Sequence, residues 1–182
     1  QDGIDIYFGT FAQSFALIGG FISSTKQVVT YLRYNMRSQI FAKSLPMPLV
    51  YGLLKRLELI NKHPEYKTKL WDITKKLQSG LVEAGFNIGD TNTCVTPVYM
   101  NGSIPEATNM VIDLRENFGI FCSMVVYPVI PKGMIILRLI PTAVHTEEDV
   151  KYTIESFSKI KDKLYGGLYM ADKIREGFAQ KL

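Results

Sequence analysis

An arginine inside an apolar run is the first residue whose type and setting suggest chemistry. Arg138 lies within the run Ile-Ile-Leu-Arg-Leu-Ile, where a guanidinium without a partner would be costly. Its planar fork of N–H donors suits a two-pronged contact with a carboxylate. The partner is either a carboxylate of the same chain, the commoner arrangement in proteins, or a carboxylate of a ligand. The run alone leaves both alternatives open.

A threonine at the end of a short apolar segment is a second candidate. Gly9-Thr10 interrupts the apolar pattern of residues 4–8, which predicts a strand that delivers a loop. A short hydroxyl side chain at such a strand end is able to donate a hydrogen bond to a ligand. The spacing alone favours the other interpretation, a turn residue that bonds to its own backbone.

The cysteines and histidines do not form the clusters that metal sites need. Cys94 and Cys122 stand apart in two apolar segments, and His63 and His145 have no clustered partners. We therefore expect no metal site, and two unbridged thiols in a reducing, cytoplasmic compartment. His145 is expected to fix the turn into the last helix.

Composition and charge indicate a globular chain and exclude several classes. Of the 182 residues, 47% are hydrophobic, and the net charge of +4 comes from dispersed basic side chains, so we expect no nucleic-acid binding. The longest apolar stretches, residues 124–130 and 134–140, have the length of strands. No transmembrane segment is therefore expected.

Strands and helices must position these residues. Periodicity predicts a strand and three helices in the first part of the chain, at residues 4–8, 26–36, 49–60 and 66–84. Because one strand cannot make a sheet, its neighbours are expected upstream. One side of the helix at residues 49–60 is expected to be buried.

The pattern changes near residue 85. Strands are predicted at residues 95–100, 121–126 and 135–140, and helices at residues 105–117 and from residue 147. Gly85 and Gly119 are expected to end helices, and Thr146 to cap the last one. We therefore predict a boundary between residues 1–84 and a small α+β domain at residues 85–182. Residues 173–182 are expected either to form a further amphipathic turn or two or to fray.

Three ordered blocks of the sequence resemble the α-oxoamine synthases, a family of pyridoxal-phosphate-dependent enzymes. They are DIYFGTFAQSFALIGGF at residues 5–21, YLRYNMRSQIFAKSLPMP at residues 31–48 and YPVIPKGMIILRLIPTAVHT at residues 127–146. The resemblance covers residues 4–165. It implies an α/β subunit of the PLP-dependent transferase fold type I, here the end of the large domain and the carboxy-terminal small domain, with the rest of the enzyme upstream.

The resemblance also implies a reaction and a cofactor, pyridoxal 5′-phosphate (PLP). The family condenses an amino acid with an acyl-CoA in a homodimer whose active sites lie at the subunit interface. A lysine forms an imine with the cofactor and then acts as a base. At that position this sequence has Gln13, and a carboxamide has neither a nucleophilic amine nor useful basicity. This chain alone is therefore expected to be inactive.

Four further site residues follow from the resemblance. Thr10 matches the hydroxyl donor to the cofactor phosphate, and Arg138 matches the arginine that holds the substrate carboxylate. Phe41 and Ala42 match the place where the family reaches the partner's phosphate. The family usually has serine or threonine at the second of these positions, so Ala42 departs from the pattern.

The residues leave three functions open. The run Pro-Val-Ile-Pro-Lys-Gly resembles the glycine-using 2-amino-3-ketobutyrate CoA ligases, which we favour. The other blocks are shared closely with serine palmitoyltransferases. The third alternative is a non-catalytic, lysine-less partner subunit that stabilises a catalytic chain.

Overall fold

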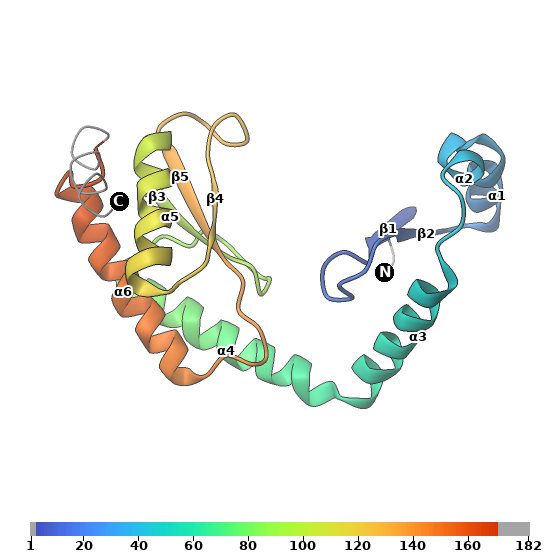
Figure 1. Ribbon diagram of the computed structural model, residues 1–182, viewed down its shortest axis with the longest axis horizontal. Helices are drawn as coiled ribbons and strands as arrows, with labels where there is room; N and C mark the ends of the chain where they lie inside the picture. The colour runs from blue at the N-terminus through green and yellow to red at the C-terminus, as the bar shows by residue number, and fades with distance from the viewer. Residues whose placement is uncertain (1–2, 171–182) are drawn as a thin grey trace. The chain divides into compact units, whose positions relative to one another are not determined.

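The computed structural model describes residues 3–170, and contacts divide the chain into two compact units, Gln1–Pro64 and Glu65–Leu182 (Figure 1). The predicted turn at residues 173–182 lies outside the described residues. Among those described, no helix combines the length and apolar character needed to span a membrane.

The first unit opens with a two-stranded antiparallel sheet. Strand β1 (Ile6–Thr10) pairs with β2 (Gly20–Ser24), so that Thr10 lies opposite Gly20. The prediction of a single strand in this part of the chain is wrong, because glycine allows a second strand to return very close to the first. A Cβ added to Gly20 would lie 2.7 Å from the carbonyl oxygen of Gly9.

Three helices complete this unit. Helices α1 (Lys26–Asn35) and α3 (Met47–Lys62) confirm two predicted helices, and the short α2 (Arg37–Phe41) was not predicted. The expected burial of one side of α3 is not met within residues 3–170. Leu54, Leu57 and Ile60 remain 45–57% exposed because the described residues of this unit do not cover them.

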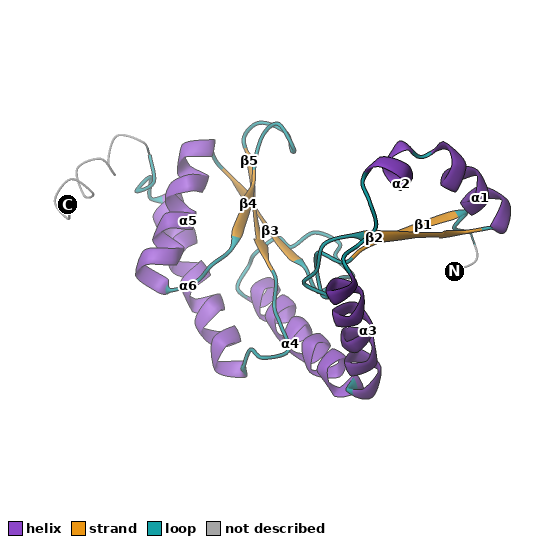
Figure 2. Ribbon diagram, turned by 45° about the vertical axis from the view of Figure 1, so that its right-hand side comes forward, coloured by secondary structure: helices purple, strands orange, loops and turns teal. Residues whose placement is uncertain are grey.

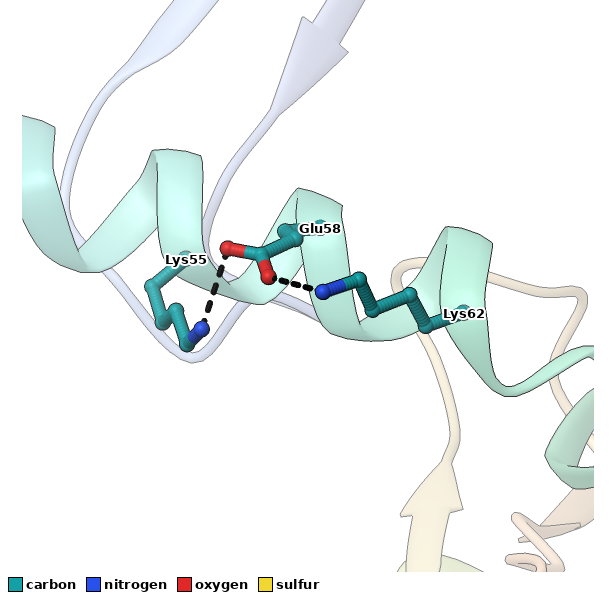
Figure 3. A network of polar contacts seen from close by, with 3 residues as sticks. All are labelled: Lys55, Glu58 and Lys62. Atoms are coloured by element: carbon teal, nitrogen blue, oxygen red, sulfur yellow. Dashed lines mark hydrogen bonds and ion pairs between the residues drawn. The ribbon is translucent and has the colours of Figure 1, made fainter.

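Another side of α3 carries a small charged network. Glu58 accepts hydrogen bonds from Lys62 at 2.6 Å and from Lys55 at 3.0 Å (Figure 3). The bond from Lys62, and then the one from Lys55, holds the pKa of Glu58 below its ordinary value. Pairs at this spacing on an exposed helix surface support the helix, and they indicate no site.

The second unit has the predicted α+β architecture. Its antiparallel sheet has the order β3-β5-β4, formed by β3 (Thr96–Asn101), β5 (Met134–Leu139) and β4 (Ser123–Val125). Helices α5 (Ile104–Phe118) and α6 (Glu147–Tyr165) lie on one side of this sheet (Figures 1 and 2). Helix α4 (Pro64–Glu83) begins the unit.

Alternation along β5 determines what faces the core. Ile135, Leu137 and Leu139 are at most 5% exposed and join the buried faces of the helices. Because side chains on a strand alternate, Ile136 and Arg138 lie on the other face of the sheet.

Buried side chains of α4 belong to the same core as β5. Ile73, Leu77 and Leu81 contribute to it, so α4 packs with the second unit. The domain boundary near residue 84 stays a prediction.

The predicted helix ends are confirmed. Thr146 caps α6 in a capping box with Asp149. Gly119 ends α5 in the left-handed conformation, with φ of 65°. At the end of α4, Gly85 has φ of 75°, and the N–H of Phe86 bonds to the carbonyl of Leu81.

Candidate functional site

The loop between β1 and β2 carries Gln13, three residues after Thr10, which ends β1. The N–H of Phe11 donates to the carbonyl of Gly19 at 2.9 Å, which closes the base of the loop. The carbonyl of Gln13 accepts from the N–H of Ala16 at 2.9 Å, and Ala16 has a left-handed φ of 47°. The side chain of Gln13 therefore stands exposed at a turn held by backbone bonds.

The hydroxyl of Thr10 is placed for either of its two predicted roles. It accepts a hydrogen bond from the N–H of Ala12 at 3.2 Å, as a turn residue does. Its own hydrogen points toward the carbonyl of Gly19 at 3.4 Å, which is long for a bond from a hydroxyl. A phosphate oxygen would be a stronger acceptor, so the exposed hydroxyl fits a phosphate contact.

Gln13 does not fit a covalent bond to the cofactor. Its carboxamide is able to donate and accept hydrogen bonds, but it has no amine that attacks an aldehyde. The residues of this loop therefore suit a phosphate group and exclude an imine between cofactor and chain at this position.

The glycine pair brings the following segment close to the loop. Gly19 has φ of +114°, and a Cβ at this residue would lie 3.0 Å from Leu45. Before Leu45, Phe41 ends α2 and is 69% exposed, and Ala42 caps the helix through its N–H to Ser38. Both predicted residues thus lie on the surface of the first unit.

Arg138 lies on the open face of the small sheet. It is exposed, so the cost expected from an apolar setting does not arise, because alternation along β5 turns this side chain away from the core. Its Nε donates to the hydroxyl of Ser123 at 3.1 Å. Within residues 3–170 no carboxylate pairs with it. The guanidinium is therefore available to a ligand anion.

Ser123 is a candidate that sequence reasoning missed. It lies on β4 directly opposite Arg138 of β5. Fifteen residues separate the two along the chain, and no local sequence pattern indicates that they pair. The sequence predicted the two strands that carry them, but not the register in which these strands pair.

His145 acts as predicted in the turn before α6. Its Nδ1 accepts from the backbone N–H of Thr142 at 2.9 Å and lies 3.2 Å from the hydroxyl of that residue. In the described part of the chain, no group of three His, Cys, Asp or Glu side chains is placed to hold a metal ion.

Both cysteines are free, as predicted. Cys122 is buried beside the sheet, and burial raises the pKa of its thiol to about 11. The candidate residues are thus Thr10 and Gln13 in the first unit, and Arg138 and Ser123 in the second unit.

Comparisons with known proteins agree with the three sequence blocks. The family described as aminotransferase class I and II matches residues 1–157. A cysteate-C-fatty acyltransferase of Capnocytophaga ochracea is 63% identical over 171 residues, which cover 94% of this chain and 41% of that protein. An 8-amino-7-oxononanoate synthase of Petrotoga mobilis is 33% identical over 88% of this chain and 40% of that protein. A serine palmitoyltransferase of Sphingobacterium spiritivorum is 31% identical over 87% of this chain and 39% of that protein.

Solved structures give the same result for the fold. The serine palmitoyltransferase of Sphingomonas wittichii superposes with a TM-score of 0.77 at 26% identity, covering 91% of this chain and 41% of that one. A structure described as SPT with PLP internal aldimine has a TM-score of 0.75 at 28% identity, covering 86% and 39%. The chain spans about two fifths of the length of the curated relatives it matches. It belongs to the aminotransferase class I and II family, with the fold type I architecture, and within that family to the α-oxoamine synthases that its sequence blocks resemble.

Proposed function

We propose that this chain is part of a PLP-dependent acyltransferase that joins a fatty acyl group, supplied as acyl-CoA, to an amino acid, and that the amino acid is cysteate. The observation that carries this proposal is the 63% identity to a cysteate-C-fatty acyltransferase over 94% of the chain, against 33% and 31% for the other two relatives. The glycine-using ligase that we favoured from the sequence is not confirmed. We therefore propose cysteate, in place of glycine, as the amino acid substrate.

Candidate residues in each of the two units suit the binding steps of such a reaction. The hydroxyl of Thr10 is free to turn from the carbonyl of Gly19 to a cofactor phosphate oxygen. The guanidinium of Arg138, which has no carboxylate partner within residues 3–170, is suited to hold the amino acid carboxylate. When bound, PLP supplies an electron sink for the charge that develops at Cα of the amino acid.

Gln13 supports a second candidate function. A carboxamide offers neither the covalent anchor nor the base that proton removal from Cα requires. A protein with glutamine here would bind the cofactor without a covalent bond and contribute little catalysis. That behaviour is expected of a lysine-less subunit that stabilises a catalytic partner.

A homodimer is part of the proposal. Tyr31, Tyr34 and Phe41 of the first unit are 65–80% exposed. Exposed large apolar side chains in such numbers are typical of surfaces that another polypeptide covers. The cytoplasmic location predicted from the two free thiols is retained with the proposal.

The test compares the full-length protein with its Gln13→Lys variant. The natural protein is expected to show reversible PLP binding and no link to the cofactor after borohydride reduction. Gln13→Lys is expected to gain that link and to raise acyl transfer to cysteate about 100- to 10,000-fold, the usual value of a positioned base. Gln13→Arg is the matched control, because it adds a positive charge without an amine that forms an imine.

The outcomes separate the alternatives. If Gln13→Lys binds no cofactor covalently and transfers no acyl group, the acyltransferase proposal is wrong and the lysine-less partner takes its place. If the variant is active but prefers serine or glycine to cysteate, only the choice of amino acid is wrong.

A further inference from the structure

We infer that Ser123 is a positioning residue for the amino acid substrate. Its hydroxyl accepts a hydrogen bond from Nε of Arg138, so that the two terminal nitrogens of the guanidinium remain to bind the substrate carboxylate. This inference rests on the proposed function, because it assigns the orientation of the arginine that the proposal uses. It adds a residue that lies outside the three sequence blocks.

The register of the sheet brings the two side chains together. Strands β4 and β5 are antiparallel, and Ser123 lies directly opposite Arg138. Directly opposed residues bring their side chains together on one face of the sheet. The Oγ of Ser123 accepts from Nε of Arg138 at 3.1 Å. On the other flank Pro97 lies opposite Arg138, and its ring has no hydrogen-bonding group.

The geometry of the guanidinium determines which of its donors remain for a ligand. Its donors form two edges that can bind a carboxylate by two parallel bonds, one with Nε and one with both terminal nitrogens. Ser123 occupies Nε, so the terminal edge remains. A long side chain held in one orientation also loses less freedom when the ligand binds.

The residue before Ser123 fixes the position of the strand that carries it. Cys122 is 5% exposed and anchors the chain in the core just before β4. Ser123 follows on the opposite face by alternation. The serine hydroxyl is therefore held against the arginine by a buried neighbour.

The experiment measures cysteate binding by titration calorimetry with the full-length protein saturated with PLP. Ser123→Ala is expected to raise the Kd about 3- to 10-fold, the range of one hydrogen bond that orients a charged group. Ser123→Thr keeps the hydroxyl and is expected to stay within about 2-fold of the parent. Thr108→Ala is the matched control, because that hydroxyl bonds only to Ile104 within its own helix, and no change is expected.

A double substitution separates positioning from a general structural effect. In an Arg138→Ala background, Ser123→Ala is expected to cause no further loss, because the serine acts through the arginine. If Ser123→Ala weakened cysteate binding equally with and without Arg138, the inference would be overturned. It would also be overturned if Ser123→Thr weakened cysteate binding as much as Ser123→Ala does.

The failure of the inference is distinguishable from failure of the proposed function. If Arg138→Ala weakens cysteate binding and Ser123→Ala does not, the positioning role alone is wrong. If Arg138→Ala leaves the Kd unchanged, or the parent binds no cysteate, the carboxylate role in the proposed function is wrong, and the inference falls with it.

Discussion

Replacing Asp113 with Asn tests the polar cluster that ties the chain after α6 to α5. Oδ2 of Asp113 accepts from Lys163 at 2.7 Å and from the hydroxyl of Tyr169, while Oδ1 accepts from Asn117 at 2.6 Å. Burial by itself would raise the pKa of Asp113, but the bonds from Lys163, Tyr169 and Asn117 outweigh it and hold the pKa below its ordinary value. Burial, and then the bond to Asp113, raises the pKa of Tyr169.

The expected loss of stability follows from the hydrogen bonds to a charged carboxylate that Asn cannot form. The substitution removes the negative charge that Lys163 and Tyr169 share, and a hydrogen bond to a charged group contributes about 1.5–3 kcal/mol. The side chain of Asp113 is only 11% exposed, but that of Lys163 is 36% exposed. Lys163 can therefore form hydrogen bonds to water in the variant, which offsets part of the lost stability. We expect Asp113→Asn to lower the free energy of unfolding at neutral pH by about 2–4 kcal/mol.

The sign of the pH dependence follows from the lowered pKa. The stabilising contribution of Asp113 is present above the ordinary carboxyl pKa of about 3.9 and is lost as the pH falls through the lower pKa of the folded state. The difference between parent and Asp113→Asn is therefore expected to be largest at pH 7 and to shrink in acid.

Urea unfolding of the full-length protein, followed by circular dichroism, measures both effects. Glu116→Gln is the control, because its pair with Arg115 is more than half exposed, and a change below about 0.5 kcal/mol is expected. A loss below about 0.5 kcal/mol in Asp113→Asn, or a loss that persists unchanged at the lowest pH where the parent stays folded, would refute the reasoning.

Three further predictions concern the second unit. At pH 8 the buried thiol of Cys122, with a pKa of about 11, is expected to be alkylated far more slowly than Cys94, and peptide mass spectrometry that finds equal rates would contradict this. Since this pKa is raised, the contribution of the Cys122 thiol to stability is expected to be lost as the pH rises from about 9 toward 11. Gly119→Ala is expected to lower the free energy of unfolding by about 1 kcal/mol, because the residue has φ of 65° and nothing within 4 Å that a Cβ would meet. Gly119→Asn is expected to lose less, and urea unfolding in which Ala equals Gly would exclude the conformational explanation.

Local features of the sequence predicted most of the helices and strands. The cap by Thr146 and the helix end at Gly119 depend on neighbours within a few residues, and both were found as expected.

Features that depend on distant partners were predicted poorly. Strand β2 was missed because its pairing with β1 depends on the close approach of Gly20 to Gly9, which the apolar pattern hides. The apolar spacing of α3 predicted a buried face, but burial needs a covering element, and residues 3–170 supply none for Leu54 and Leu57.

The sequence by itself determined the family and the chemical identity of the key position. A block of residues around Gln13 is recognisable without a structure, and the absence of an amine there is a property of the residue. Only the tertiary structure decided that Ser123 holds Arg138 and that Asp113 meets Tyr169, which are 15 and 56 residues apart along the chain. Such pairs depend on strand register and helix packing, because these follow from the burial of whole faces and not from the residues next to each partner.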